Sequence, residues 1–250
     1  MAATKFPAGA SVFLHGLWAV IWPGRCPLCG ELLGDRLAQG FCPGCSSLIA
    51  PIPEPACDLC GKGFASETMP AGRVCGQCQM QRPLFDRARS FGLYDGALAQ
   101  SIRDFKFKGK RALLPALQEL MRQADRKWLS EVRADLVVPV PLHERRLIER
   151  GYNQARDLAE PVARQRRIPL LSRVLLRVRD TEPQFGLSWN QRRENLKGAF
   201  MVRDRGAVKD KTVLLVDDIM TTGITVTESV KALKKAGAKR VVVLTLARTA

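Results

Sequence analysis

The stretch "VLLVDDIMTTGIT", residues 213–225, contains a complete strand–turn–helix pattern and decides the fold of the C-terminal part of the chain. Four apolar residues lead into two adjacent aspartates, Asp217 and Asp218, and a turn with one glycine then opens a helical pattern. Neighbouring carboxylates repel each other and lose hydration when they are buried, so a purely structural role would be energetically costly. The stretch therefore predicts a buried strand whose end carries functional acids.

Apolar runs of strand length alternate with helical patterns in the rest of the C-terminal part. Buried strands are predicted at 134–140, 170–176, 211–217 and 240–247. Helix spacing extends over 152–166 and 225–236, and Gly237 is expected to end the second helix. This alternation predicts an α/β domain in which a parallel sheet has helices on both faces. Ligands of such sheets bind at the carboxyl ends of the strands, where the two aspartates fall.

The turn "TTGIT" after the acids begins a helix, so its backbone N–H groups and hydroxyls face outward at the positive end of a helix dipole. That arrangement predicts a phosphate cradle. The turn lacks the G-x-x-x-x-G-K-[ST] pattern of a P-loop and the G-x-G-x-x-G pattern of a dinucleotide site. A phosphate cradle just beyond two carboxylates suits a sugar phosphate, with its hydroxyls on the acids and its phosphate on the turn.

The same thirteen residues resemble the 5-phosphoribosyl-1-pyrophosphate (PRPP) motif of type I phosphoribosyltransferases. The resemblance implies that Asp217 and Asp218 bind the ribose 2′- and 3′-hydroxyls. It places four further residues around the 5′-phosphate: Thr221, Thr222, Gly223 and Thr225. The implied chemistry is pentosyl transfer, in which pyrophosphate leaves the anomeric carbon and Mg²⁺ binds mainly through substrate oxygens and water.

All eight cysteines lie between residues 26 and 78, in the pairs Cys26/Cys29, Cys42/Cys45, Cys57/Cys60 and Cys75/Cys78. Each half of this set repeats the zinc-ribbon layout, in which two C-x-x-C pairs offer four thiolates to one ion. A disulfide framework would need an oxidising compartment, a thioredoxin-type pair is usually single, and iron–sulfur spacings differ. The pattern predicts two structural Zn²⁺ ions, with sequential pairing favoured over a crossed arrangement.

The N-terminal segment contains the longest apolar run, "ASVFLHGLWAVIW" at 10–22, which is shorter than the roughly 20 residues of a membrane span. We expect an amphipathic helix that packs onto the following module rather than a signal peptide, and a cytoplasmic protein without a membrane span. The expected organisation is a leading helix at 1–24, a double zinc ribbon at 25–82 and a phosphoribosyltransferase-like domain at 83–250.

The net charge of +16 is unevenly distributed, because residues 1–82 contribute +1 and residues 83–250 contribute +15. A domain this basic suggests anionic partners such as phosphates, pyrophosphate or nucleic acid, and a solubilising surface is the alternative reading. A four-thiolate zinc site carries a charge of about −2. The ribbons therefore do not extend the basic surface, and a structural role is favoured for them.

Three further stretches indicate which family of phosphoribosyltransferase-like proteins the chain resembles. They are an Arg-rich loop between a strand and a helix at 137–160, a long polar loop with the profile of a lid at 177–200, and lysines on an early helix at 102–114. With the ribbons, they resemble the ComF/GntX family of competence-associated phosphoribosyltransferase-like proteins over nearly the whole chain.

This resemblance implies further site residues. The turn at 139–141 and the loop after it resemble a pyrophosphate loop, whose donors would be Arg145, Arg146 and Arg150, with solvated surface as the alternative. In the lid, the family pattern is matched by Arg179, Gln184, Arg192, Arg193 and Asn195. Arg192 or Arg193 would close onto the leaving pyrophosphate. Lys106 and Lys108 are additional candidates.

Two classes of function fit these patterns. In the first, the protein is an enzyme that transfers phosphoribose from PRPP to an acceptor. In the second, it is a non-catalytic competence factor that handles DNA, including single-stranded DNA, or contacts the competence machinery, and PRPP or a nucleotide is a regulatory ligand. Thr221 replaces an acid that purine-salvage members often carry, which weakens a purine-salvage reading. We hypothesise that the ribbons fold over the strand ends as a hood.

Overall fold

A computed structural model of the protein describes residues 24–33, 40–64, 73–181 and 188–250. All but Gly24 of the predicted leading helix, and Gln184 of the lid, lie outside these residues. Within the described ranges, every helix is too short or too polar to cross a lipid bilayer.

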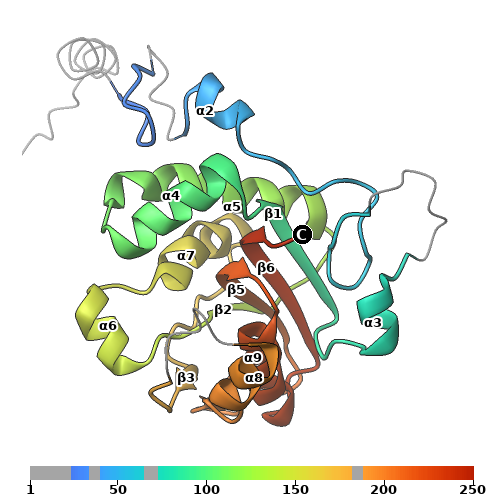
Figure 1. The fold of residues 1–250 in the computed structure, drawn as a ribbon. Helices are drawn as coiled ribbons and strands as arrows, with labels where there is room; N and C mark the ends of the chain where they lie inside the picture. The colour runs from blue at the N-terminus through green and yellow to red at the C-terminus, as the bar shows by residue number, and fades with distance from the viewer. Residues whose placement is uncertain (1–23, 34–39, 65–72, 182–187) are drawn as a thin grey trace, which may run out of the picture.

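A parallel four-stranded sheet forms the centre of the C-terminal domain (Figure 1). Its strands, in spatial order, are β1 (Arg87–Leu93), β6 (Arg240–Arg248), β5 (Thr212–Met220) and β2 (Leu136–Pro139). Strand β5 corresponds to the predicted strand at 211–217 and continues to Met220. Asp217 and Asp218 therefore both lie within the strand, near its carboxyl end. The prediction of a parallel sheet is confirmed.

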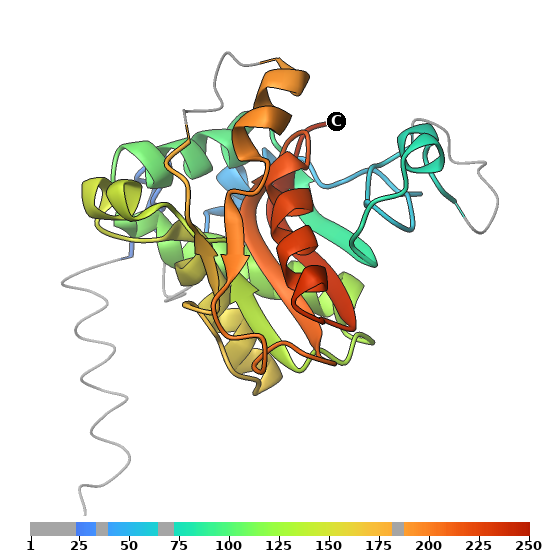
Figure 2. The same cartoon turned by 90° about the horizontal axis from the view of Figure 1, so that it is seen from below.

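Helices cover both faces of this sheet, as predicted (Figures 1 and 2). One face carries α4 (Gly96–Phe107), α5 (Leu114–Leu129, preceded by the 3₁₀ turn Arg111–Leu113) and α7 (Gln154–Arg166). The other carries α8 (Trp189–Leu196) and α9 (Ile224–Lys235). Successive apolar residues of β5 alternate between the faces: Val213 and Leu215 pack in the core with α9, whereas Leu214 and Val216 pack in the core with α5 and α7.

The predicted strand at 170–176 is wrong. Leu170 forms a single parallel bridge to Val137, a turn follows, and the short strand β3 (Leu175–Arg177) pairs antiparallel with β4 (Phe200–Val202). The physical reason is that the two ends of the run pack on opposite sides of the sheet. Leu170 contacts the core with α7, and Leu175 is buried in the core with α9, so the chain must turn between them.

Two segments expected to be loops contain helices. The Arg-rich segment after β2 forms α6 (Glu144–Arg150), which ends at Gly151 with a φ of +78°. The lid segment contains α8, which begins at a capping box formed by Ser188 and Gln191. The capping box satisfies backbone donors at the helix start, and a left-handed glycine is a common helix end, so both helices have local sequence signals.

Strand β1 was not predicted, and it lies at the edge of the sheet with the ribbon module along its outer side. The Ala88 N–H donates to the Leu59 carbonyl at 2.7 Å, and the Leu93 N–H donates to the Ala50 carbonyl at 2.9 Å. An uncovered edge strand presents unpaired backbone groups that favour aggregation. The ribbon module therefore protects this edge of the sheet.

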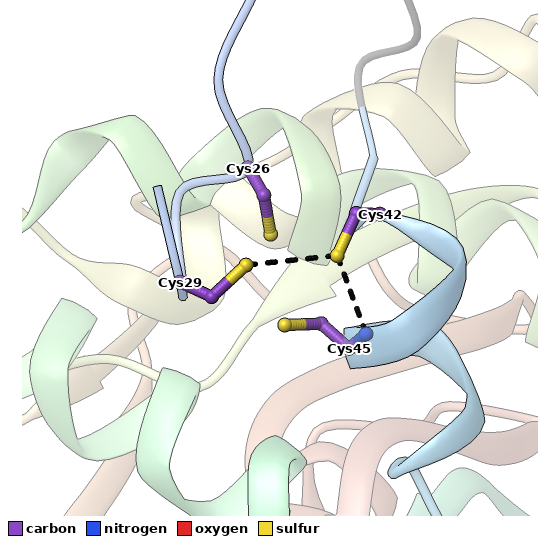
Figure 3. Close-up of side chains that lie close together, drawn as sticks. All are labelled: Cys26, Cys29, Cys42 and Cys45. Atoms are coloured by element: carbon purple, nitrogen blue, oxygen red, sulfur yellow. Dashed lines mark hydrogen bonds between the residues drawn. The ribbon is translucent and has the colours of Figure 1, made fainter. Parts of the chain in front are cut away.

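The eight cysteines form two four-cysteine groups within the described part of the chain, Cys26/Cys29/Cys42/Cys45 (Figure 3) and Cys57/Cys60/Cys75/Cys78. In each group the four sulfurs lie within 4.8 Å of one another. The Sγ–Sγ distance is 3.6 Å for Cys29 and Cys42 and 3.7 Å for Cys60 and Cys75. Tetrahedral zinc with Zn–S bonds of about 2.3 Å requires edges of about 3.8 Å. The groups therefore fit one zinc ion each, and the sequential pairing is confirmed.

The two zinc sites differ in their surroundings. All four cysteines of the second site belong to the core that also contains Phe85, Met220 and Ile224. The first site forms a small cluster of its own, and its Cys29 is exposed. Zinc in the second site consequently supports the main core, whereas zinc in the first site mainly orders its own ribbon.

We expect Cys60→Ser to lower the melting temperature of the domain by at least about 5 °C, because it removes a thiolate from a metal site embedded in the core. Cys29→Ser is the matched control and should shift the main transition much less. Calorimetry would be combined with zinc analysis. The unmodified protein should hold two zinc ions per chain, one in each four-cysteine group. Equal destabilisation by both substitutions would contradict the assignment of the second site to the main core.

Candidate functional site

The acid pair lies in the last part of β5 and is buried, with 9 % of Asp217 and 5 % of Asp218 exposed. The backbone N–H of Asp218 donates to Oδ1 of Asp217 at 2.9 Å. Burial raises the pKa of Asp217 to about 8, and the neighbouring Asp218 carboxylate adds to this effect. An apolar core does not need such groups, so the pair is a candidate site for a polar ligand.

Lys106, near the end of α4, supplies positive charge to this pair. Its Nζ lies 2.8 Å from Oδ2 of Asp218, and Nε2 of Gln154 lies 3.4 Å from the same oxygen. Burial disfavours the charged lysine, but the Asp218 carboxylate outweighs this and raises the pKa of Lys106. Lys108 instead pairs with Asp104 at 2.8 Å. Of the two candidate lysines, only Lys106 contacts the acid pair.

Two arginines on different elements face the acids with unused donors. Nη1 of Arg150, at the end of α6, and Nε of Arg177, on β3, are buried and have no hydrogen-bond partner among the described residues. Burial lowers the pKa of Arg177 to about 10, with a further contribution from Arg146, while Asp217 acts in the opposite direction. Burial also lowers the pKa of Arg150, against the attraction of Asp218. Buried guanidinium donors without partners indicate a binding place for an anion.

Sequence reasoning missed Arg177 and Gln154, because Arg177 ends β3 and Gln154 begins α7, and tertiary contacts set the positions of both elements. The three predicted arginines of α6 do not all point to the same place in the structure. Arg146 is half-buried and donates to the Thr181 carbonyl at 2.8 Å, and it lies one helical turn before Arg150 on the same side of α6. Arg145 is exposed and pairs with Glu149 and Asp180 at the surface. The structure thus brings Arg150 within electrostatic reach of Asp218, keeps Arg146 near Arg150 and Arg177, and leaves Arg145 at the surface.

The turn between β5 and α9 follows the acids directly. Gly223 occupies the N-cap of α9 with a φ of +73°, a conformation that glycine adopts without steric cost. The N-cap glycine has no side chain to cap this helix, and the first turn contains no acidic residue. The start of α9 is therefore suited to an external anion. Thr222 and Thr225 are half-buried here, and Thr221 is exposed.

A cavity of about 330 Å³ lies beside this turn and is lined by both modules of the chain. The turn contributes residues 221–224, α9 contributes Lys231, and α8 contributes Arg193. The second ribbon contributes Gln77 and Cys78. Of the predicted lid residues, Arg193 therefore lies at the turn rather than at the acids, and the side chain of Arg192 lies outside the described structure.

The other predicted lid residues occupy peripheral positions. Arg179 is exposed and donates to the Lys197 carbonyl, and Asn195 is half-buried on α8. These contacts connect the segment after β3 to the end of α8. Neither residue lines the cavity described above.

Arg248 connects the second ribbon to the same turn. It is buried at the end of β6, pairs in register with Met220, and donates to the carbonyls of Cys60 and Thr249. The Thr249 N–H donates to the Met220 carbonyl at 3.3 Å. The position of the turn is therefore coupled to the second zinc site through the end of β6.

Two family models match the chain. Residues 17–79 match a double zinc ribbon domain, and residues 157–250 match a phosphoribosyl transferase domain. The second match contains the acid pair, the turn and α9.

Known proteins are similar to this chain over most of its length. The chain is 36 % identical to Competence protein F of Haemophilus influenzae over 84 % of this chain and 91 % of that protein. It is 33 % identical to DNA utilization protein YhgH of Salmonella typhimurium over 91 % and 98 %, and 27 % identical to Competence protein ComFC of Bacillus subtilis over 80 % of each chain. The protein therefore belongs to the ComF family, whose double zinc ribbon precedes a phosphoribosyltransferase domain.

Proposed function

We propose that this protein binds PRPP with Mg²⁺ and transfers its phosphoribosyl group to an acceptor, in the competence or DNA utilization process for which its relatives are named. One observation supports the proposal most strongly. A buried acid pair interacts electrostatically with Arg150 and Arg177, and each of these arginines has a buried guanidinium nitrogen without a hydrogen-bond partner within the described residues. A ligand with sugar hydroxyls and a separate polyanionic group satisfies both sets of atoms.

The acids are assigned to the ribose. Carboxylate oxygens of Asp217 and Asp218 accept hydrogen bonds from the 2′- and 3′-hydroxyls, which places the sugar over the end of β5. Lys106 and Gln154 hold the Asp218 carboxylate in position through their contacts with Oδ2. The 5′-phosphate then extends toward the start of α9, where the N-cap residue Gly223 lets the backbone approach it.

The pyrophosphate is assigned to the arginine side of the site. Nη1 of Arg150 and Nε of Arg177 donate to its oxygens, and Mg²⁺ is held mainly by the pyrophosphate and water. In the reaction, the bond between C1 of the ribose and the pyrophosphate oxygen breaks, and the bonding electrons leave with the pyrophosphate. The arginines stabilise that leaving charge, while the nearby carboxylates stabilise positive charge on the ribose. The acceptor supplies the electron pair of the new bond to C1.

A non-catalytic role is the second candidate, because residues 83–250 carry a net charge of +15 that also suits DNA. In that case PRPP or a nucleotide binds at the acids and regulates DNA handling. Pyrophosphate release, followed with PRPP, Mg²⁺ and acceptors that include single-stranded DNA, separates the two. Steady release that Asp217→Asn abolishes supports the enzyme. DNA binding that is insensitive to this substitution, without release, supports the second candidate.

Asp217→Asn should weaken PRPP binding at least tenfold and also stabilise the fold. Unfolded aspartate titrates near 4, whereas burial raises the pKa of Asp217 to about 8 in the folded protein. Between these values the unfolded chain has released a proton that the folded protein retains, so the free energy of unfolding of the unmodified protein falls as the pH rises. Asparagine does not titrate, so the stability advantage of the variant should grow by about 4 kcal/mol between pH 5 and pH 8, because each pH unit in this range is worth about 1.4 kcal/mol.

Urea unfolding at pH 5 and pH 8, with titration calorimetry for PRPP, measures both effects. Asp135→Asn is a control for a carboxylate outside the site, since this residue accepts from the Thr212 N–H at the start of β5. A variant that is less stable than the unmodified protein at pH 8 would contradict the cost assigned to the buried acid.

Arg177→Gln should weaken PRPP binding about 10- to 100-fold, because a charge-assisted hydrogen bond to pyrophosphate is lost. Ribose 5-phosphate lacks the pyrophosphate, so its affinity should change much less. Arg145→Gln is the matched control, because Arg145 lies at the surface, and it should leave both affinities near their original values. Titration calorimetry in the presence of Mg²⁺ measures the affinity of each variant for PRPP and for ribose 5-phosphate. An equal loss for the two ligands would remove Arg177 from the pyrophosphate site.

A further inference from the structure

Phe107 is the last residue of α4 and is 70 % exposed, which is unusual for an aromatic ring beside a buried site. Single exposed apolar residues are common on protein surfaces and need no explanation by themselves. Leu48 and Met80, at 66 % and 87 % exposure on the ribbon module, are examples in this chain. Phe107 differs from them in the charged groups that surround its ring.

Two cations of the candidate site contact this ring. Nζ of Lys106 lies 5.9 Å from the ring centroid and 2.8 Å from Oδ2 of Asp218. Cζ of Arg150 lies 5.5 Å from the same centroid. The ring is therefore linked to the acid pair through Lys106. It also contacts Arg150 directly, and Nη1 of Arg150 is a donor assigned to pyrophosphate.

We propose that Phe107 is the stacking platform for a planar nitrogen heterocycle at C1 of the ribose, either the incoming acceptor or the base of the nucleotide product. This inference rests on the proposed function, since it requires a ribose on the acid pair. An exposed aromatic face stacks on any heterocyclic base, and the neighbouring cations attract the electron-rich edge of the base and the phosphate of the same ligand. The acceptor is thereby assigned to the class of nucleobase-like heterocycles, rather than to an amine or a protein side chain.

Comparison of two ligands isolates the contribution of the heterocycle. Ribose 5-phosphate and nucleoside 5′-monophosphates share the sugar and the phosphate, but only the nucleotides carry a base at C1. Titration calorimetry with the zinc-loaded full-length protein should show at least one nucleotide among AMP, GMP, CMP and UMP binding about tenfold more tightly than ribose 5-phosphate. Phe107→Ala should remove that difference and leave the affinity for ribose 5-phosphate unchanged. Phe107→Trp should keep or increase it, and the control Leu48→Ala should preserve it.

The outcomes separate this inference from the proposed function. If ribose 5-phosphate does not bind the unmodified protein, the proposed function and the platform both fail. If it binds but no nucleotide binds more tightly, or if Phe107→Ala retains the difference, the platform alone is overturned. If Phe107→Ala weakens binding of a single-stranded oligonucleotide while the nucleotide difference persists, the ring serves a nucleic-acid strand, which also overturns the acceptor assignment.

Discussion

The ion pair between Lys106 and Asp218 is the interaction on which the candidate site depends. Two adjacent carboxylates at the end of a buried strand repel each other and are poorly solvated, and Lys106 provides the nearest opposite charge at 2.8 Å. The pair joins the end of α4 to the end of β5, so it also positions α4 relative to the central sheet. The compensation is partial, because Asp217 keeps a raised pKa. The site thus retains an electrostatic imbalance that a ligand with hydroxyl donors and Mg²⁺ can relieve.

The ribbon module is part of the architecture of the domain rather than an attachment to it. A segment of this size buries little apolar surface, and four-thiolate zinc replaces the missing core. Its backbone hydrogen bonds to β1 cover the edge of the sheet, and its second zinc site shares the core beneath α9. The cavity beside the turn at 221–224 is lined by both modules, which is the feature that our hood hypothesis requires of the second ribbon. The first ribbon lies elsewhere, with Leu28 and Phe41 against the core of α4 and α5.

The features that could be predicted from the sequence are those encoded by contiguous residues. The strand, acids, turn and helix at 213–225 follow one another in the chain, and the cysteine spacing favoured the sequential pairing that the structure shows. Arg177 and Gln154 could not be identified in this way, because their places depend on how β3 packs against β4 and α9 and on how α7 packs against β5. The strand expected at 170–176 failed for a related reason, since the apolar run serves two separate cores. The helix signals at Ser188 and Gly151 were present but lay in polar segments without apolar periodicity.

The contact of Arg248 with the Cys60 carbonyl has a consequence for dissecting this protein. A fragment that begins after the ribbons would expose the full outer edge of β1 and remove one of the two carbonyl acceptors of the Arg248 guanidinium. Open strand edges pair with other copies of the chain, and a buried charge that loses an acceptor weakens the local fold. Such a fragment would be prone to self-association, and its loss of ligand binding would report damage to the turn rather than a direct contact between ribbon and ligand. Point substitutions in the intact chain are therefore the appropriate way to divide roles between its two modules.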